Sequence, residues 1–305
     1  MTLGFRTFTY LALLFVLAPA AWIIISVVSH AIPHWQWSVL SDALSPNESS
    51  GGLRNQILGT LVLMIGVLII AGTVGVLAGV HLAELARPRK NGKPSGGFLR
   101  TASDVLSGFP SIVLGYVGYV ALVVGLHWGF SLIPALIILS IMVVPYIAKT
   151  TENSLRQVPT GYREGADALG MTSGYTLRKV VLKSALPGIV TGLLLALAIA
   201  VGETAPLIYT AGFANKLPAS ALNSQFPYLT YVVFKFYDQP SVQAHYLSYD
   251  ADLILLVLVL LLLVASRTLV QRTQRYSESA RTRDGARRMP WRRTPAADLT
   301  KLPRP

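Results

Sequence analysis

The chain has 305 residues, of which 52% are hydrophobic and only 13% are charged. Soluble domains carry about 25% charged residues, so this composition excludes an ordinary soluble protein and indicates an integral membrane protein. The sequence contains no cysteine, which excludes a disulfide, a thiolate metal site and a cysteine nucleophile. The net charge of +12 is compatible with a nucleic-acid partner, so its distribution along the chain must be considered.

Six apolar runs are long enough to cross a bilayer, for which a helix needs about 20 residues. The first could be mistaken for a signal peptide, but its apolar stretch continues to Val28, beyond a typical signal core. We therefore expect an uncleaved first helix and an all-α membrane protein with six transmembrane helices. The expected spans are roughly 8–28, 56–82, 104–126, 132–148, 188–209 and 251–269.

The lysines and arginines predict the orientation of these spans. If the N-terminus is cytoplasmic, 23 of the 26 basic residues lie on the inner side, as the positive-inside rule requires. Both termini are then cytoplasmic, and residues 271–305 form a basic cytoplasmic tail that we expect to be disordered. The positive charge is explained by this bias, and no nucleic-acid partner is needed.

Two of the expected spans carry residues that predict how their helices pack or break. Ala71, Gly75 and Gly79 are spaced four residues apart, which lets a neighbouring helix approach closely. In the third span, Gly108 and Pro110 are expected to interrupt the helix near its inner end. Such a break is tolerated at membrane depth where it faces protein or a water-filled cavity. A simple kink is the alternative interpretation.

The inner segment between the fourth and fifth spans is predicted to hold a short helix. Pro159 and Thr160 form a helix entry with Thr160 as N-cap, and Gly170 is well placed to end the helix. Tyr162, Ala166 and Leu169 then share one face at helical spacing. The helix either inserts this face into a cytoplasmic partner or lies flat on the membrane.

The same segment resembles the EAA loop of ABC importer permeases. That motif reads E-A-A, three residues, G, nine residues and I-x-L-P, and it marks the coupling helix that contacts the ATPase. Here Glu164-Gly165-Ala166, Gly170 and Val180-x-Leu182 match it in spacing, with Gly165 in place of alanine and Lys183 in place of proline. The resemblance implies a type I importer permease with a cytoplasmic coupling helix. It assigns ATPase coupling to Tyr162, Glu164, Gly165, Ala166, Leu169 and Gly170.

Three further stretches resemble the PstA family, the permease subunits of phosphate-specific ABC importers. They are "PYIAKTTENSLRQVPTGYREGADALG", "GETAPLIYTAGF" and "GFPSIVLG", and the resemblance covers roughly residues 55–270. It implies a permease domain over 56–270 with its coupling loop at about 150–187, preceded by a first helix and outer loop over 1–55.

The implied complex lies in the bacterial inner membrane, with the lipid bilayer around it. Its other components would be a related PstC-like permease, two copies of an ATPase and an extracytoplasmic phosphate-binding protein. No cofactor is expected on this chain. The sequence has no G-x-x-x-x-G-K-[ST] loop, so ATP and Mg²⁺ would be used by the partner ATPase.

Glu203, in "VGETAPLI", is a carboxylate within an expected lipid-buried helix, where a charge costs a few kcal/mol. It could pair with a basic residue of the partner permease, act on the substrate through its proton or its charge, or accept bonds from backbone freed by Gly202 and Pro206. The family often has a basic residue four positions earlier, where this chain has Ile199, so intrachain pairing is not expected. Candidate pathway or subunit-pairing residues are Glu203, Thr204, Ser111, Pro110 and Pro206.

Three other functions are weighed against this one. A permease for another oxyanion, such as molybdate or sulfate, would share the coupling loop. A stand-alone transporter or channel would act without ATP or partner chains. A membrane-bound enzyme would need a catalytic constellation, and the sequence shows no paired carboxylates in one span, no histidine cluster at metal spacing within the bundle and no nucleophile with an evident base.

Overall fold

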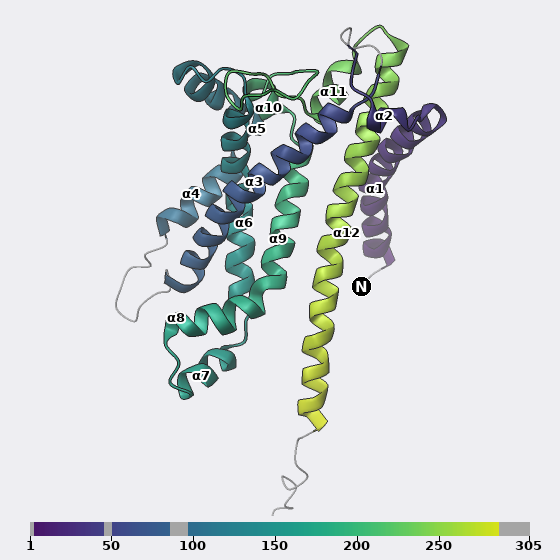
Figure 1. Cartoon of the computed structure of the whole chain (residues 1–305). Helices are drawn as coiled ribbons and strands as arrows, with labels where there is room; N and C mark the ends of the chain where they lie inside the picture. The colour runs from purple at the N-terminus through teal and green to yellow at the C-terminus, as the bar shows by residue number, and fades with distance from the viewer. Residues whose placement is uncertain (1–2, 46–50, 86–96, 287–305) are drawn as a thin grey trace, which may run out of the picture.

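The computed structural model describes residues 3–45, 51–85 and 97–286 (Figure 1). Five helices in these ranges are long and apolar enough to cross a membrane, and a sixth crossing results if the bent pair 97–108 and 111–125 counts as one span. The all-α membrane fold is therefore confirmed. The helical segments are α1 (Leu3–Ala31), η1 (Ile32–His34), α2 (Ser38–Ser41), α3 (Arg54–Val80), η2 (His81–Leu85), α4 (Gly97–Gly108), α5 (Ser111–Gly118), η3 (Tyr119–Gly125), α6 (Leu132–Arg156), α7 (Thr160–Ala168), α8 (Ser173–Thr176), η4 (Leu177–Val181), α9 (Leu182–Gly202), α10 (Ala205–Thr210), α11 (Leu229–Phe236) and α12 (Val242–Ala286).

The centre of the bundle is formed by α3, α6 and α9 (Figure 1). The small residues predicted on α3 allow this packing: a Cβ at Gly75 would lie 2.7 Å from Ile147 Cβ, and one at Gly79 would lie 2.5 Å from Thr151 Cβ. Only glycine therefore lets α3 approach α6 so closely. The prediction from the four-residue spacing is confirmed.

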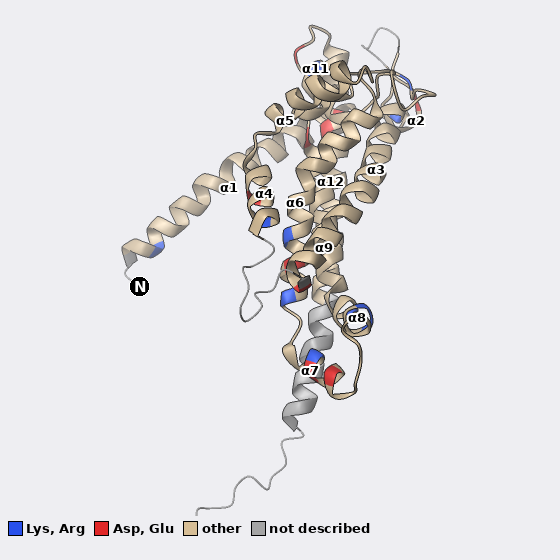
Figure 2. Cartoon of the chain, turned by 90° about the vertical axis from the view of Figure 1, so that its left-hand side faces the viewer, with Lys and Arg blue, Asp and Glu red and all other residues tan. Residues whose placement is uncertain are grey.

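The first helix, α1, departs from the rest of the bundle (Figure 2). Only 6% of the residues in its most apolar stretch are buried. It is held at its C-terminal end, where His30 stacks on Tyr249 at 4.7 Å and His34 stacks on Tyr246 at 3.9 Å between ring centroids. These two stacking contacts join the end of α1 and the following η1 to α12.

The fifth span and the last span differ from their predicted bounds. The fifth span ends at Gly202, and Glu203 lies in a non-helical link before α10. Pro206 explains this break, because a proline ring clashes with the carbonyl four residues earlier, which belongs to Gly202. The last helix, α12, runs from Val242 through Ala286, so the first part of the expected disordered tail is helical. The rest of the basic tail and most of the basic loop between α3 and α4 lie outside the described residues.

Candidate functional site

The predicted cytoplasmic helix is present as α7, and its ends have clear causes. Pro159, rather than Thr160, is the N-cap, because its backbone is extended (φ −55°, ψ 137°) and the helix begins one residue later. Gly170 has φ +70°, a conformation that favours glycine. The Met171 N–H donates to the Ala166 carbonyl at 3.1 Å and the Gly170 N–H to the Asp167 carbonyl at 3.0 Å. These two bonds form a Schellman motif, which confirms Gly170 as the helix stop.

Part of the apolar face predicted on α7 packs against this chain, and part of it is exposed to solvent. Tyr162 is 53% exposed and Leu169 is 75% exposed, whereas Ala166 is only 5% exposed. Ala166 therefore packs within this chain, and the assignment of these residues to ATPase coupling stays a prediction. Together they line a hollow between α7 and the start of α9, where Lys183 also lies. Glu164 and Gly165 are exposed on the same helix.

Substitution by alanine should have opposite effects at Gly165, within α7, and at Gly170, just after its C-terminal end. A Cβ at Gly165 meets open space in the helix, so Gly165→Ala should stabilise α7 by about 1 kcal/mol. Gly170→Ala forces a side chain into the left-handed region and should destabilise the helix end by about 1 kcal/mol. In hydrogen-exchange measurements on the purified complex, the α7 amides should exchange about five-fold more slowly in the first variant and faster in the second. Equal changes in both variants would contradict this assignment.

An ion pair that the sequence analysis missed joins α7 to the inner end of the second span. The Arg163 guanidinium donates two hydrogen bonds to the Glu84 carboxylate, at 2.6 Å and 2.8 Å. The side chains are 17% and 15% exposed. Bidentate pairs of this kind are strong and fix geometry. The two residues are 79 positions apart, and no local pattern relates them, so sequence reasoning had no signal for the pair.

A second group of polar contacts joins α4 and α6 at the same end of the molecule. The Arg100 guanidinium bonds to the Glu152 carboxylate at 3.0 Å and to the Leu82 carbonyl at 3.3 Å. Arg156, one turn along α6, also contacts Glu152 at 2.7 Å. Lys and Arg gather around the lower end of α6 and around α7 and α8 (Figure 2). This end of the bundle therefore carries many charged side chains, and ion pairs and hydrogen bonds connect its helices.

The two helix breaks, at Pro110 and at Glu203, lie against each other. Pro110 is the N-cap of α5 and Thr204 is the N-cap of α10. The two short helices pack so closely that a Cβ at Gly115 would lie 2.7 Å from Pro206 Cα. The predicted break at Pro110 is thus present, with a bend of 101° between the two helical parts.

Glu203 occupies the link between α9 and α10 and is partly buried. Its carboxylate interacts with the Ser111 hydroxyl, and its backbone carbonyl accepts a hydrogen bond from Thr230 at 3.1 Å. The structure therefore brings together the five predicted residues of this site, Pro110, Ser111, Glu203, Thr204 and Pro206.

No backbone N–H and no basic side chain of the described residues contacts the Glu203 carboxylate. The three interpretations of Glu203 given above all stay predictions. Gly202 is exposed with open space around it, and Pro110 is exposed as well, so this break faces away from the chain's own core.

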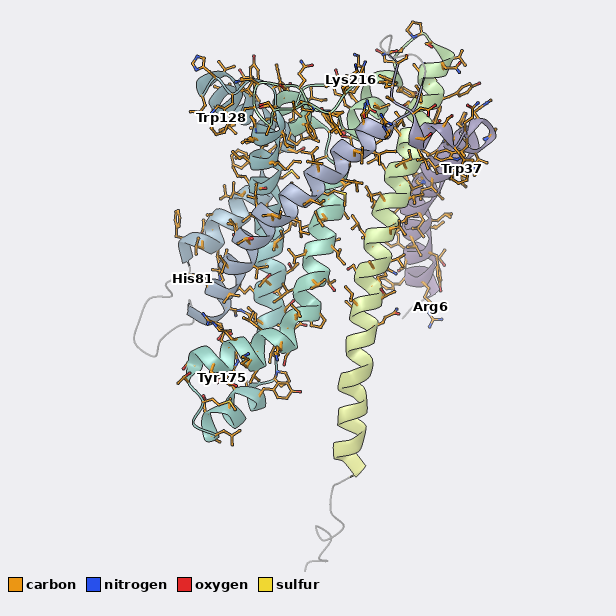
Figure 3. The ribbon with its side chains drawn as sticks, in the orientation of Figure 1. Arg6, Trp37, His81, Trp128, Tyr175 and Lys216 are labelled. Atoms are coloured by element: carbon orange, nitrogen blue, oxygen red, sulfur yellow. The ribbon has the colours of Figure 1, made fainter. Side chains whose placement is uncertain are left out.

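The labelled side chains mark the two ends of the bundle (Figure 3). Tyr175 on α8 and Arg6 on α1 lie toward one end, whereas Trp37, Trp128 and Lys216 lie toward the other. Broken apolar helices and a loop helix exposed at one end of a bundle of apolar spans define a class of protein: a multi-pass membrane permease.

Comparison with known proteins agrees with this class. Residues 71–279 match the family described as "Binding-protein-dependent transport system inner membrane component". The chain is 55% identical over 253 residues to the phosphate transport system permease protein PstA 2 of Mycobacterium bovis, covering 83% of this chain and 82% of the relative. It is 33% identical over 249 residues to PstA of Yersinia pestis, covering 81% and 82%. The chain therefore belongs to this transport family and, within it, to the PstA permeases.

The fold is also found in a solved structure. The inward-facing MetNI methionine ABC transporter aligns over 78% of this chain and 96% of its own, with a TM-score of 0.54 and 23% sequence identity. At this identity the likeness concerns the fold alone. It confirms the predicted ABC importer permease architecture, in which the bundle of α3, α6 and α9 carries a loop helix at one end.

Proposed function

We propose that the chain is the permease subunit of an ATP-driven importer of inorganic phosphate and forms half of its translocation pathway. The observation that carries the proposal is the 55% identity to a phosphate transport permease over 83% of this chain. The sequence "GETAPL" at residues 202–207 supports the same substrate. In the structure this run forms the break between α9 and α10.

The proposed complex contains three further kinds of chain. A PstC-like permease supplies the other half of the pathway, and two copies of an ATPase hydrolyse ATP with Mg²⁺, because this sequence has no phosphate-binding P-loop. An extracytoplasmic protein delivers phosphate, in keeping with the family's binding-protein dependence. This chain is then a non-catalytic subunit of an ATP-hydrolysing machine.

The proposed orientation places α7 and α8 in the cytoplasm of a bacterium, with the complex in its inner membrane. The start of α1 and the later part of α12 lie toward the same end as α7 and α8 (Figure 1). This arrangement supports cytoplasmic termini. The positive-inside rule supports them too, because 23 of the 26 basic residues fall in inner segments if the N-terminus is cytoplasmic. The opposite end then faces the protein that delivers phosphate.

The coupling helix α7 would transmit ATPase motion to the spans. Tyr162 and Leu169 are exposed at the end of the molecule, where a groove of the ATPase can cover them. The Arg163–Glu84 pair adds a third connection, to η2 at the end of α3, beyond the chain links to α6 and α9. When ATP closes the ATPase dimer, the α7 helices of the two permeases would move together and turn these spans.

The link around Glu203 would line the pathway or the interface with the partner permease. Glu203 and Ser111 interact across the two breaks, and Gly115 and Pro206 interlock below them. We therefore expect the two breaks to move as one unit. A basic residue of the partner permease facing Glu203 would balance its charge, since a carboxylate alone would repel phosphate.

Uptake of radiolabelled phosphate at micromolar concentration tests this function, in cells lacking the gene and in cells with the gene restored. We expect uptake to return with the gene and to be blocked by arsenate but not by sulfate or molybdate. Glu203→Gln should lower uptake at least tenfold, because the charge that balances the partner or releases the substrate is lost. Thermal stability of the variant complex is the control for folding.

Other outcomes would favour the alternative functions. Competition by molybdate or sulfate would indicate an importer of that oxyanion. Uptake that persists without the ATPase would indicate a stand-alone transporter. Full activity of Glu203→Gln would remove Glu203 from the pathway while leaving the substrate assignment intact.

A further inference from the structure

A polar hollow of about 460 Å³ opens at the end of the bundle opposite α7. It lies where the end of α1, the short α2 and the start of α12 meet (Figure 1). This hollow is far from both sites described above and contains none of their residues. Its size exceeds that of a single ion and suits a long side chain with water around it.

The hollow contains a buried carboxylate that lacks a partner. Asp250 is only 3% exposed, and its Oδ1 has no hydrogen-bond partner among the described residues. A second carboxylate, Asp42, lines the same hollow and accepts a hydrogen bond from Ser41 at 2.9 Å. None of the described lining residues is Lys or Arg. Since a buried carboxylate without a partner is costly, a cation that enters the hollow would stabilise it.

The walls of the hollow favour an organic cation. Trp35 and Tyr246 line it, and the Tyr246 ring is held in place by stacking on His34. Aromatic faces attract ammonium and guanidinium groups, and a guanidinium can pair with a carboxylate through two bonds. The described residues hold no cluster of three metal-binding side chains, so the arrangement fits a side chain better than a metal ion.

We propose that this hollow receives a Lys or Arg side chain of the binding protein that delivers phosphate, with Asp250 as its buried counter-ion. The proposal rests on the proposed function in one respect, since it requires such a protein on this face. The hollow lies on the face that this protein must approach, and its charge is complementary to a basic side chain. Rim charges set the association rate, whereas a buried pair mainly sets the dissociation rate.

The test is the affinity of phosphate-loaded binding protein for the complete transporter in nanodiscs. Asp250→Asn keeps the shape of the side chain and removes its charge, so the dissociation constant should rise at least tenfold, mainly through faster dissociation. Asp238→Asn is the matched control, because Asp238 is an exposed carboxylate in the turn between α11 and α12 and does not line the hollow. The affinity of the Asp238→Asn transporter for the binding protein should stay within two-fold of the wild-type value.

A second variant keeps the test informative if Asp250→Asn fails to assemble. Gln36 is exposed and lines the hollow, so Gln36→Lys supplies a cation from the chain itself. This variant should assemble normally, retain or raise its thermal stability, and bind the partner at least tenfold more weakly. Wild-type affinity in either assembled variant would overturn the proposal. Loss of binding-protein affinity when the wild-type transporter is treated with a chelator would also overturn the proposal, because it would identify a metal ion as the ligand.

Failure of the proposed function can be told apart from failure of this inference. If the wild-type complex binds only a protein loaded with another oxyanion, the substrate assignment fails. The same variants then test the hollow with that protein. If phosphate uptake requires the binding protein but neither variant changes its affinity, the function stands and the assignment of the hollow is wrong.

Discussion

In Glu84→Arg, phosphate uptake should fall at least tenfold while the assembled complex continues to hydrolyse ATP. The wild-type carboxylate accepts two hydrogen bonds from Arg163, and both side chains are less than one-fifth exposed. Reversal places two guanidinium groups together in a site shielded from water, where like charges repel strongly. The inner end of α3 then separates from α7, and ATPase motion reaches the spans through α6 and α9 alone.

The measurement is the number of ATP molecules hydrolysed per phosphate transported in proteoliposomes. The double variant Glu84→Arg with Arg163→Glu restores opposite charges and should recover at least part of the coupling. Asp104→Arg is the matched control, because Asp104 pairs with Lys149 at 3.4 Å while both side chains are 68% exposed. Exposed pairs contribute little, so this reversal should change the ratio by less than two-fold. An unchanged ratio in Glu84→Arg would mean that the pair is not needed for coupling.

Features that depend on neighbouring residues could be predicted from the sequence. Gly170 ends α7 because glycine alone readily adopts its φ of +70°, and Pro110 breaks the third span because proline cannot continue a helix. The spacing of Ala71, Gly75 and Gly79 likewise identified the face of α3 that contacts α6. Each is a local rule about backbone geometry or side-chain size.

Features that depend on distant residues could not be predicted. Glu84 and Arg163 lie in different inner segments, and Asp250 and Asp42 line the same hollow only after the segment around α2 has come together with α12. The break at Glu203 is an intermediate case. Pro206 was visible in the sequence, but the apolar residues around it favoured one continuous span, because hydropathy records burial and not backbone continuity. The contact between Glu203 and Ser111 followed only from the packing of α5 on α10.

In Gly79→Leu, the chain should lose most of its folded, assembled form. A Cβ at this position would lie 2.5 Å from Thr151 Cβ and 2.6 Å from the Ala148 carbonyl oxygen. The second contact is with backbone, which cannot move aside as a side-chain end can. The helices α3 and α6 must therefore separate, and overpacking of this kind costs about 3 kcal/mol. Fluorescence-detected size exclusion and the thermal midpoint of the complex measure the loss.

Two further variants separate the effect of position from the effect of leucine. Gly4→Leu adds the same side chain to α1, where a Cβ meets nothing within 4 Å, and the complex should assemble as in wild type. Gly79→Ala adds only the Cβ and should give an intermediate loss, because the close contacts with Thr151 and Ala148 are made by that atom. If Gly79→Leu assembled as well as Gly4→Leu, α3 and α6 would not be packed at this distance. The inner end of α3, including the position of Glu84 beside α7, would then need another support.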